Sequence, residues 1–549
     1  VILSEMSQNL QMSSIRLLGY GLNKAMKRLF HARQRQHGRL QPTAQGYPVI
    51  LMPNHRSYMD FLIISFLSFT YDLPIPVIAA GTPLSKMKLM GEIFRRCGAF
   101  YIRRGIGSDK LYWAFCPSMV KTIVRRAYAP LEFYVEGLRS RTLKALPPKL
   151  GMMHMVLEPF FKGEVYDITL VPISISYDRV VEESLLAHEL LGVPKPRETT
   201  RGLLKASSVL WENYGSMHVN IGQALSVRAM CQGKIDRNHY NRVPRDLPQK
   251  PGEDMQACVS LLAHRVVRDQ EQGAVLSPWS LMATVLLQSP VPSLVQEGLP
   301  WGALAQRTLW LRGHALAFGA RLNWPGGWVG GCGESDEVMS SNMSLHHSVA
   351  RRRGGRVFLL EEEGFAGRRP TSAEEGVAWR AVAVLMMASH RNQALHVFAR
   401  PAMLAVAMHV TASRQRRELQ AFFVFLLDVF SVEIVFTPGQ SSQDFEEACS
   451  LLGKAGAIQC CQEEISVTDA GQQTMTFLKT LLQPFMDSYQ VTCRHIVPID
   501  WLTDWSMTAF YRLLFLNSEL QTYEALSSDT QSNALSSLLR LEAVTKLRT

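Results

Sequence analysis

The segment Asn54–Asp60, "NHRSYMD", follows the apolar run "PVILMP" and contains side chains that could do acid–base chemistry. His55 could take a proton from a hydroxyl, and Asp60 could hold its imidazole in one tautomer and stabilise the charged form. On a regular helix, five residues rotate the chain about 500°, or about 140° net, so the two side chains could not share a face. They can meet only if His55 precedes a helix and the chain curls at Ser57.

A structural interpretation of the same segment competes with the chemical one. Ser57 and Asp60 fit the S-x-x-D pattern of a capping box, in which Asp60 would accept from a backbone N–H and His55 would be a polar loop residue. The spacing alone is a weak signal, because His264 and Asp269 repeat it within a helical pattern where the side chains diverge. A strand end followed by a helix cap would provide the required curl, so the cap and the pair are compatible.

Three further segments contain basic side chains: "GAFYIRR" (98–104), "FYVEGLRSR" (133–141) and "PPKLG" (147–151). Arginine suits phosphate because its guanidinium offers two donors in a fixed fork. Glycine lets the backbone approach a ligand closely. We therefore expect a phosphate site with Glu136 and Gly137 shaping its turn, and with these basic ligands: Arg104, Arg139, Arg141 and Lys149. The G-x4-G-K-[ST] loop is absent from the sequence, which argues against a nucleotide-triphosphatase site.

The charge of the chain also favours an anionic ligand. Its 549 residues carry a net charge of +11, and the window from Lys86 to Lys149 holds 14 basic and 4 acidic side chains, which is nearly the whole excess. We interpret this window as a folded anion-binding face for a phosphorylated metabolite or a membrane surface. A nucleic-acid-binding module is disfavoured, because the window lacks interleaved aromatic residues and a recognisable binding motif.

The elements that must position these residues alternate along the chain. Apolar runs predict strands, with helical stretches between them, at 47–53, 74–80, 98–104, 131–137, 168–178 and 217–225. A basic amphipathic helical segment covers 7–40. The pattern predicts an α/β fold with a mixed sheet flanked by helices, and ligands in such folds bind at strand ends. From 253 the pattern is mainly helical, with one β run at 432–438.

Four segments, "NHRSYMD", "GAFYIRR", "FYVEGLRSR" and "VPISISYD", occur in the order and approximate spacing of the glycerolipid acyltransferases. The chain resembles that family closely from about 48 to 290 and more loosely beyond. Segments such as "YDLPIPVIAAG", "LLGVPKPRE" and "LSPWSL" are most similar to members that acylate dihydroxyacetone phosphate. The resemblance implies these parts: an N-terminal helical segment (1–45), an acyltransferase domain (46–290), a linker region (291–356) with a Gly/Ser-rich loop, and a mainly helical C-terminal domain (357–549).

The resemblance also implies a mechanism. His55 would be the general base, oriented by Asp60, and the hydroxyl oxygen of the acceptor would attack the acyl-CoA thioester directly. Ser57 would cap the helix rather than act as a nucleophile. The basic ligands named above would clamp the phosphate, and Pro172 would shape the acyl-CoA channel. Neither a metal nor another cofactor is expected, since acyl-CoA is itself a substrate.

The implied reaction is esterification of dihydroxyacetone phosphate with a long-chain acyl group, the first step of ether phospholipid (plasmalogen) biosynthesis. Glycerol 3-phosphate is an alternative acceptor that the residues do not distinguish. A non-catalytic membrane-associated scaffold is an alternative of another class. It predicts loss of the histidine or the aspartate of the first segment, and both are present. The third segment departs from the usual E-G-T-R-S-R at Leu138, which removes a hydroxyl near the expected phosphate.

Location and partners are expectations of the same kind. Nine cysteines without C-x-x-C pairs, and no secretory leader, favour an intracellular compartment. The ending "VTKLRT" contains Thr545-Lys-Leu547, which resembles a peroxisomal tripeptide of the S-K-L type, but two residues follow it. We expect the luminal side of the peroxisomal membrane and peripheral association, because no clean membrane-spanning segment is evident. The family implies a complex with alkylglycerone-phosphate synthase. We hypothesise that the C-terminal third docks to that partner or to the membrane.

Overall fold

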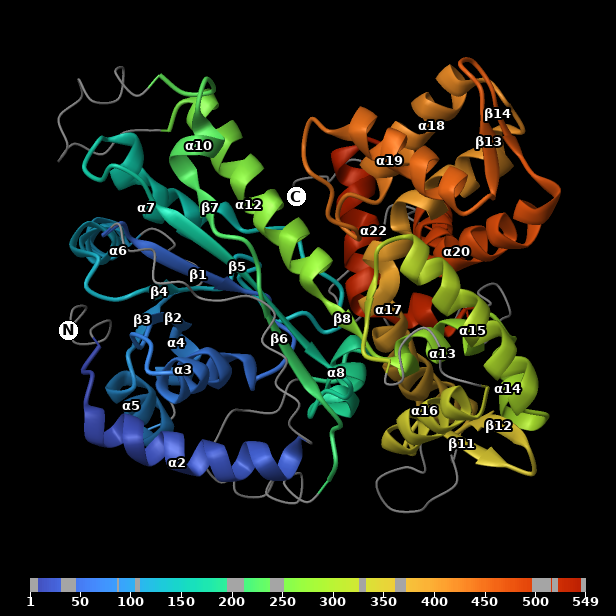
Figure 1. Ribbon diagram of the computed structural model, residues 1–549, viewed down its shortest axis with the longest axis horizontal. Helices are drawn as coiled ribbons and strands as arrows, with labels where there is room; N and C mark the ends of the chain where they lie inside the picture. Colours follow the sequence, from blue (N-terminus) through green and yellow to red (C-terminus); the bar gives the residue numbers. More distant parts are fainter. Residues whose placement is uncertain are drawn as a thin grey trace. The chain divides into compact units, whose positions relative to one another are not determined.

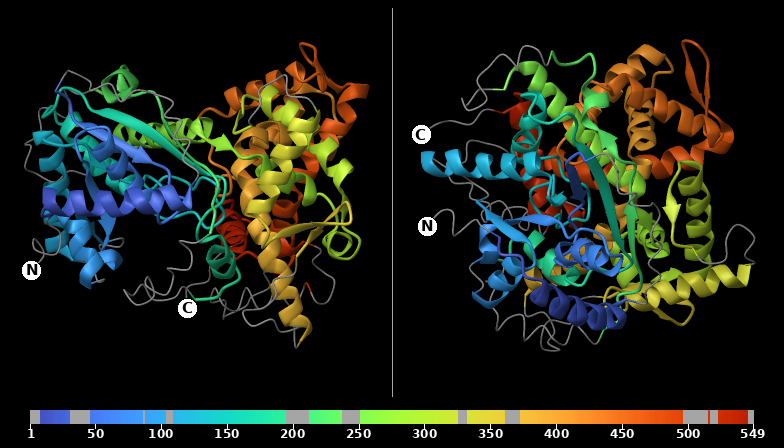
Figure 2. Two further views of the ribbon diagram at one scale, coloured as in Figure 1. Left: turned by 60° about the horizontal axis from the view of Figure 1, so that its bottom comes forward. Right: turned by 60° about the vertical axis from the view of Figure 1, so that its left-hand side comes forward.

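A computed structural model describes most of the chain (Figure 1 and Figure 2). The described residues are 8–30, 46–85, 88–103, 109–194, 212–236, 251–324, 332–360, 372–495, 515 and 522–544. The chain forms two compact units. The first contains Val1–Arg139, Pro147–Val181 and Pro196–Ala274, and the second contains Ser140–Leu146, Glu182–Lys195 and Val275–Thr549. Each unit is described separately below.

The first unit is built on a seven-stranded mixed sheet in the order β3-β2-β4-β1-β5-β6, with β7 paired to β5. β5 is parallel to β1 and antiparallel to β6 and β7, whereas β1 to β4 pair with one another in parallel. The strands are β1 (Val49–Pro53), β2 (Val77–Gly81), β3 (Ala99–Ile102), β4 (Leu131–Glu132), β5 (Thr169–Tyr177), β6 (Met217–Ile221) and β7 (Leu225–Ser226). This arrangement confirms the predicted α/β class with a mixed sheet.

Helices cover the sheet on both faces. The helices of this unit are α2 (Met12–Leu29), α3 (Asp60–Thr70), α4 (Thr82–Ser85), α5 (Lys88–Arg96), α6 (Lys110–Arg126), α7 (Leu150–Phe161), α10 (Val227–Cys231) and α12 (Glu253–Gly273). In Figure 1, α3 and α5 lie on one side of the sheet and α7 and α12 on the other. The connection β1-α3-β2 runs toward the β3 edge and β4-α7-β5 runs the opposite way. Right-handed crossovers therefore place their helices on opposite faces.

Burial explains why the central strands read as continuous apolar runs. Every residue of β5 is buried, and so are four of the five residues of β1. Strands covered on both faces lose the alternation of polar and apolar residues that a half-exposed strand shows. These two strands meet in parallel register, with Met52 opposite Pro172.

The strand expected at 131–137 is shorter than predicted. Only Leu131 and Glu132 pair within the sheet, and the chain then turns, with Gly137 N–H donating to the carbonyl of Tyr134 at 3.0 Å. Gly137 has a φ of +70°, a conformation that other residues adopt only with strain. The glycine thus ends the strand early and directs the following residues along the edge of the sheet.

The second unit is mostly helical, as predicted, and its centre is the 39-residue helix α17 (Ala373–Thr411). The helices around it are α8 (Glu183–Leu190), α13 (Pro278–Leu286), α14 (Val291–Gln296), α15 (Trp301–Ala317), α16 (Cys332–Leu345), α18 (Arg416–Val429), α19 (Ser441–Lys454), α20 (Gln472–His495) and α22 (Ser528–Arg540). Among the described residues, α17 is the one helix long and apolar enough to cross a membrane. However, 67% of its most apolar window is buried inside the protein, as in the core helix of a globular domain.

The linker expected at 291–356 is folded wherever it is described. It forms α14, α15, α16 and a hairpin of β11 (Ala350–Arg353) and β12 (Arg356–Leu359), all within the second unit. Gly354 and Gly355 have positive φ angles of +56° and +74° and make the two-residue turn of that hairpin. The glycines that suggested a flexible loop are therefore the residues that such a tight hairpin requires. The chain passes from the first unit to the second for the last time at 274/275.

Two other local expectations differ from the structure. The β run expected at 432–438 has no strand; Glu433 and Ile434 donate backbone N–H bonds to the carbonyl of Phe430 in a turn that follows α18. Side chains from this turn are buried, so tertiary packing rather than strand pairing accounts for its apolar residues. In the first unit, Cys231 and Cys258 form a disulfide with a Cα–Cα distance of 6.5 Å, a pairing that the cysteine pattern did not indicate.

Candidate active site

The end of β1 and the start of α3 bring His55 and Asp60 together. The Nδ1 atom of His55 lies 3.1 Å from Oδ2 of Asp60. The side chain of Asp60 is completely buried, whereas that of His55 is 19% exposed. The expected curl around Ser57 is present, because His55 precedes the helix and Asp60 is its first residue. The rejected pair behaves differently: within α12, His264 bonds to the carbonyl of Ser260 and Asp269 pairs with Arg265.

The carboxylate of Asp60 accepts hydrogen bonds from four donors. Oδ2 accepts from the backbone N–H groups of Arg56 (2.6 Å) and Ser57 (2.8 Å), in addition to the His55 ring. Oδ1 accepts from the hydroxyl of Tyr177, at the end of β5, at 2.5 Å. A buried carboxylate is tolerated only when donors of this kind replace water. Asp60 makes the bond to the Ser57 N–H that a capping box would contain, but the expected cap by Ser57 is absent: the N-cap of α3 is Met59, which has no side-chain cap bond, and Ser57 Oγ accepts from the N–H of Met59 at 3.1 Å. The Asp60 side chain therefore holds the turn before the helix and orients the histidine.

These contacts fix the tautomer of His55. An ionised carboxylate can only accept, so Nδ1 carries the proton and Nε2 carries the lone pair. The ring of Tyr134 stacks on the imidazole with a centroid separation of 4.3 Å and an interplanar angle of 27°. The histidine is therefore held by one hydrogen bond and one stacked ring. This arrangement is suited to general base catalysis through Nε2.

Glu136 secures the backbone of the same segment. Nη1 of Arg56 lies 2.8 Å from each carboxylate oxygen of Glu136, and the N–H of His55 donates to Oε1 at 3.2 Å. The side chains of this ion pair are 10% and 0% exposed. Glu136 thus orients the guanidinium of Arg56, a contact that the sequence analysis did not predict. Because β1 and β4 are adjacent and parallel, the residues that follow them emerge at the same edge of the sheet.

Two of the predicted phosphate ligands belong to the described part of the first unit. The guanidinium carbon of Arg139 lies 4.1 Å from the centroid of the Tyr58 ring, with Nη2 3.5 Å from its hydroxyl. Lys149 is exposed and precedes α7, and its N–H donates to the carbonyl of Val135 at 2.8 Å. A Cβ added to Gly137 would lie 3.0 Å from Cγ of Lys149, so the glycine also makes room for this lysine.

The remaining predicted residues have other surroundings. Arg104 lies outside the described residues. Arg141 belongs to the second unit, where it forms an ion pair with Asp529. Pro172 is buried in β5 and its carbonyl accepts from the N–H of Gly222 at 2.8 Å. Leu138, which replaces the usual threonine, is 45% exposed.

A second buried carboxyl group lies beneath the pair. Glu132, on β4, is fully buried, and no donor among the described residues reaches its carboxyl oxygens with hydrogen-bond geometry. The hydroxyl of Tyr134 interacts with this carboxyl group but also lacks a partner with hydrogen-bond geometry among the described residues. Burial raises the pKa of the Glu132 carboxyl well above its ordinary value. The neighbouring Tyr134 hydroxyl partly opposes the rise, and the negative charge of Asp60 adds to it. Glu132 is therefore a neutral acid in the folded protein at pH values where an exposed glutamate is ionised.

Sequence reasoning missed several residues that complete the site. Arg56, Tyr58 and Tyr177 stand within the segments that were quoted, but their partners are 80 to 117 residues away along the chain. A tyrosine at the end of a predicted parallel strand was the available signal for Tyr177. Nothing in the sequence indicated that Glu132, inside an apolar run, would be a buried acid.

Comparisons with known proteins match both parts of the chain. Residues 34–176 match the sequence model described as "Acyltransferase", and residues 186–546 match the one described as "Glycerol-3-phosphate acyltransferase C-terminal region". The chain is 43% identical over 553 residues to the dihydroxyacetone phosphate acyltransferase of Mus musculus and 42% identical over 554 residues to that of Homo sapiens. Each alignment covers 99% of this chain and 79% of the relative. A glycerol-3-phosphate acyltransferase of Pseudomonas putida (strain GB-1) is 28% identical over 81% of this chain and 50% of that protein.

The mixed sheet, the histidine–aspartate pair at the end of its β1 strand and these matches define an acyltransferase. The chain belongs to the family of glycerol-3-phosphate and dihydroxyacetone phosphate acyltransferases.

The buried Glu132 predicts a pH-dependent stability. Its folded-state pKa is raised, while the unfolded chain ionises near the ordinary glutamate value of about 4.3. Its contribution to stability is complete below that value and is lost as pH rises toward the folded-state pKa, by about 1.4 kcal/mol per pH unit. Glu132→Gln keeps the shape and neutrality of the protonated acid and has no proton to lose. We expect the variant to gain stability relative to the wild type as pH rises above the ordinary glutamate pKa toward the raised folded-state pKa of Glu132.

The measurement is the difference between the urea midpoints of the two proteins at each pH. Glu92→Gln, at a half-exposed site on α5, is the matched control and should show no such trend. Parallel curves for wild type and Glu132→Gln would contradict the buried neutral acid.

Proposed function

We propose that this protein transfers a long-chain fatty acyl group from acyl-CoA to the hydroxyl of dihydroxyacetone phosphate. The observation that carries the proposal is the His55–Asp60 pair at the end of β1, in a chain whose relatives at 42–43% identity are named dihydroxyacetone phosphate acyltransferases. The reaction would be the first step of ether phospholipid (plasmalogen) biosynthesis.

In the proposed mechanism, Nε2 of His55 takes the proton of the acceptor hydroxyl. The oxygen attacks the thioester carbonyl carbon, a C–O bond forms, and the C–S bond breaks as the tetrahedral intermediate collapses. The thiolate of CoA leaves and accepts the proton from the imidazolium, so the enzyme returns to its starting state. Asp60 stabilises the imidazolium, and the stacked Tyr134 ring keeps it in place. The step uses no enzyme nucleophile, and we propose that it needs no cofactor.

The acceptor's phosphate would be bound by basic residues at the same edge of the sheet. Arg139 supports this role best, because its stack on Tyr58 ties it to the segment that carries His55. Lys149 is exposed beside Gly137 and would add a point charge. We also propose Arg104 and Arg141 as phosphate ligands on the strength of the family resemblance. We propose further that Pro172, at the centre of β5, shapes the acyl-CoA channel.

Glycerol 3-phosphate is a second candidate acceptor. The C-terminal family model carries its name, and so do the bacterial relatives at 28–29% identity. The two acceptors differ at C2, a ketone in one and a secondary alcohol in the other. Acyl transfer to both therefore has to be measured side by side.

The first test of the proposed mechanism removes the general base, His55. Purified protein should transfer palmitate from palmitoyl-CoA to dihydroxyacetone phosphate, and His55→Gln should lower kcat by about 10²–10⁴-fold or more, since general base catalysis contributes about that much. His264→Gln is the matched control, because that histidine has the same spacing to an aspartate but lies within α12. Its kcat should stay near the wild-type value.

Three outcomes of this assay discriminate the alternatives. Activity with dihydroxyacetone phosphate that disappears in His55→Gln supports the proposal. A higher kcat/KM with glycerol 3-phosphate would move the assignment to that acceptor and keep the mechanism. Absence of transfer to either acceptor by folded wild-type protein would favour the non-catalytic scaffold.

The second prediction concerns Tyr58. Tyr58→Leu removes the ring on which Arg139 stacks, and a cation–π contact near the surface contributes about 0.5–1 kcal/mol. We expect the KM for dihydroxyacetone phosphate to rise about 2–5-fold, with kcat and the KM for palmitoyl-CoA little changed. Tyr58→Phe keeps the ring and should behave like the wild type. Tyr71→Leu, at an exposed tyrosine that ends α3, is the control. An equal rise in both KM values would argue against a phosphate role for Arg139.

We propose peripheral membrane association through α2. Leu17 and Tyr20 are 75% and 61% exposed and, with Lys24 and Arg28, follow the i, i+3, i+7 and i+11 spacing of one helix face. An exposed apolar face with flanking basic residues suits the interface of an anionic bilayer. The double substitution Leu17→Glu/Tyr20→Glu should weaken binding to phosphatidylcholine/phosphatidylserine vesicles about 10-fold or more in a sedimentation assay. Leu111→Glu, at another exposed leucine, is the control, and an equal loss there would contradict the role of α2.

The peroxisomal lumen and a complex with alkylglycerone-phosphate synthase complete the proposal. The tripeptide at 545–547 supports the location, and the pathway supports the partner, because that enzyme consumes the acylated product. A tagged chain that ends at Leu547 should enter peroxisomes and one that ends at Val544 should not; cytosolic fluorescence of both would refute the location. Since 332–356 is folded into the second unit, the partner is tested with the full chain, and failure to co-purify with the synthase would refute the complex.

A further inference from the structure

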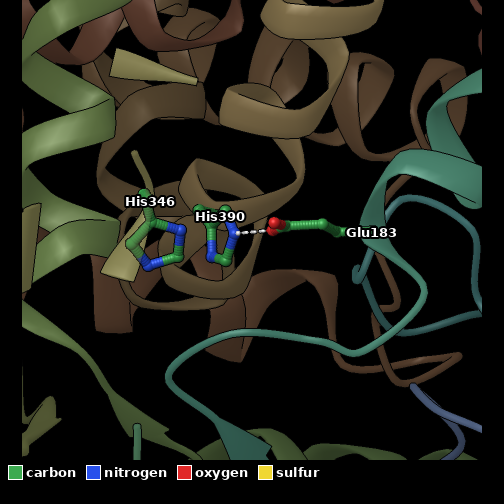
Figure 3. Close-up of side chains that lie close together, drawn as sticks. All are labelled: Glu183, His346 and His390. Atoms are coloured by element: carbon green, nitrogen blue, oxygen red, sulfur yellow. Dashed lines mark hydrogen bonds and ion pairs between the residues drawn. The ribbon is translucent and has the colours of Figure 1, made fainter. Parts of the chain in front are cut away.

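Three buried side chains with metal-binding atoms converge in the second unit, outside the site described above. They are Glu183 at the first position of α8, His346 directly after α16, and His390 in the middle of α17 (Figure 3). One donor atom from each lies within 4.8 Å of the other two. We propose that these three side chains bind a single Zn²⁺ ion that stabilises the second unit.

The distances suit a zinc site. Two ligand atoms at about 2.0–2.1 Å from a tetrahedral zinc lie about 3.3 Å apart. Nε2 of His390 and Oε2 of Glu183 are separated by 3.2 Å. Figure 3 shows His390 between the other two side chains, with its ring nitrogen directed at the Glu183 carboxylate. The third donor is close enough to complete the set by a small movement of the His346 ring, since the largest separation is 4.8 Å.

The donor set selects zinc from the common biological cations. Two imidazoles and one carboxylate are a known zinc ligand set that leaves the fourth position of the tetrahedron to a water molecule, whereas Mg²⁺ and Ca²⁺ prefer oxygen ligands. A dication also resolves an electrostatic difficulty, because a carboxylate and two imidazoles are packed together with almost no access to solvent. His346 and His390 are fully buried, and Glu183 is 6% exposed. This burial keeps substrates away from the three side chains, so we assign the ion a structural role.

Neighbouring groups hold the rings in place for coordination. The indole of Trp279 stacks on His346 at a centroid distance of 4.6 Å with an interplanar angle of 9°, and its edge faces His390. The side-chain amide of Gln393 lies 3.2 Å from Nδ1 of His390. Because amide oxygen and nitrogen can be interchanged, Gln393 can accept from Nδ1–H and leave Nε2 with a lone pair for the metal. The apolar ring and the amide together provide the outer support that metal-bound histidines usually have.

The competing interpretation is a hydrogen bond between His390 and Glu183 without an ion, with His346 as an aromatic core residue. The first experiment separates the two on the wild-type protein. Full-length protein, with any tag removed, is dialysed against metal-free buffer, and its zinc is measured by mass spectrometry. We expect about one zinc per chain, and removal by a strong chelator should lower the thermal midpoint by roughly 5 °C or more, restored by ZnCl₂. Zinc below about 0.1 per chain, with no uptake of added ZnCl₂, would overturn the proposal.

Substitutions locate the ion. His346→Phe keeps an aromatic ring on Trp279 and removes the nitrogen ligands, and should lower zinc affinity at least roughly 100-fold in competition with a chromophoric chelator. His314→Phe is the matched control, because His314 packs against Trp310 in the same unit but lies outside the cluster. It should retain about one zinc. Glu183→Gln, which removes charge with little change of shape, replaces His346→Phe if that variant does not fold.

Zinc bound by exposed cysteines is the main result that could be mistaken for zinc at the proposed site. Cys460 and Cys461 are adjacent on the surface of the same unit and could take up zinc. X-ray absorption at the zinc edge distinguishes the sites, since the proposed one has only nitrogen and oxygen neighbours at about 2.0–2.2 Å and a thiolate lies near 2.3 Å. Sulfur neighbours, full zinc retention in His346→Phe, or a different metal bound at one per chain would each overturn the assignment.

Discussion

The geometry of the site depends on the carboxylate of Asp60, a charge buried where no water reaches it. A buried carboxylate is stable only if hydrogen-bond donors surround it. Each hydrogen bond to Asp60 also holds in place the segment of the chain that donates it. The Arg56 and Ser57 amides define the curl that ends the β1 loop, the Tyr177 hydroxyl ties in β5, and the His55 ring is thereby set in one tautomer. The turn before α3 and the orientation of the histidine are consequences of the same charge.

Glu136 provides a second layer of support through the same kind of interaction. It forms a buried ion pair with Arg56 and accepts from the N–H of His55, so the third sequence segment holds the backbone of the first. The parallel pairing of β1 with β4 makes this possible, because residues 51 and 132 lie opposite one another and the chain leaves both strands at one edge. Removing either member of such a pair leaves an unpaired buried charge, which costs far more than the pair itself contributes.

The sequence predicted these strand ends well and their partners poorly. Apolar runs located β1, β2, β3 and β5, because burial on both faces leaves a continuous signal along the chain. The contacts of Tyr177 and Arg56 depend on strand order, which periodicity does not contain. The hairpin at 350–359 overlaps the region predicted to contain a Gly/Ser-rich loop, because glycines are typical both of such loops and of tight hairpin turns. The sequence did not indicate the cluster of Glu183, His346 and His390, because its members are more than 40 residues apart along the chain.

The basic window from 86 to 149 shows how a charge count can mislead. It holds few acids of its own, yet many of its cations pair with acidic residues from later in the sequence. Lys121 pairs with Glu158, Arg125 with Glu164 and Lys144 with Glu433. Such cations support the fold, and their charge is largely balanced within each unit. The count of basic residues therefore overstates the positive charge that this window offers to an anion. Arg139, which we propose as a phosphate ligand, is the described arginine of this window that stacks on the Tyr58 ring.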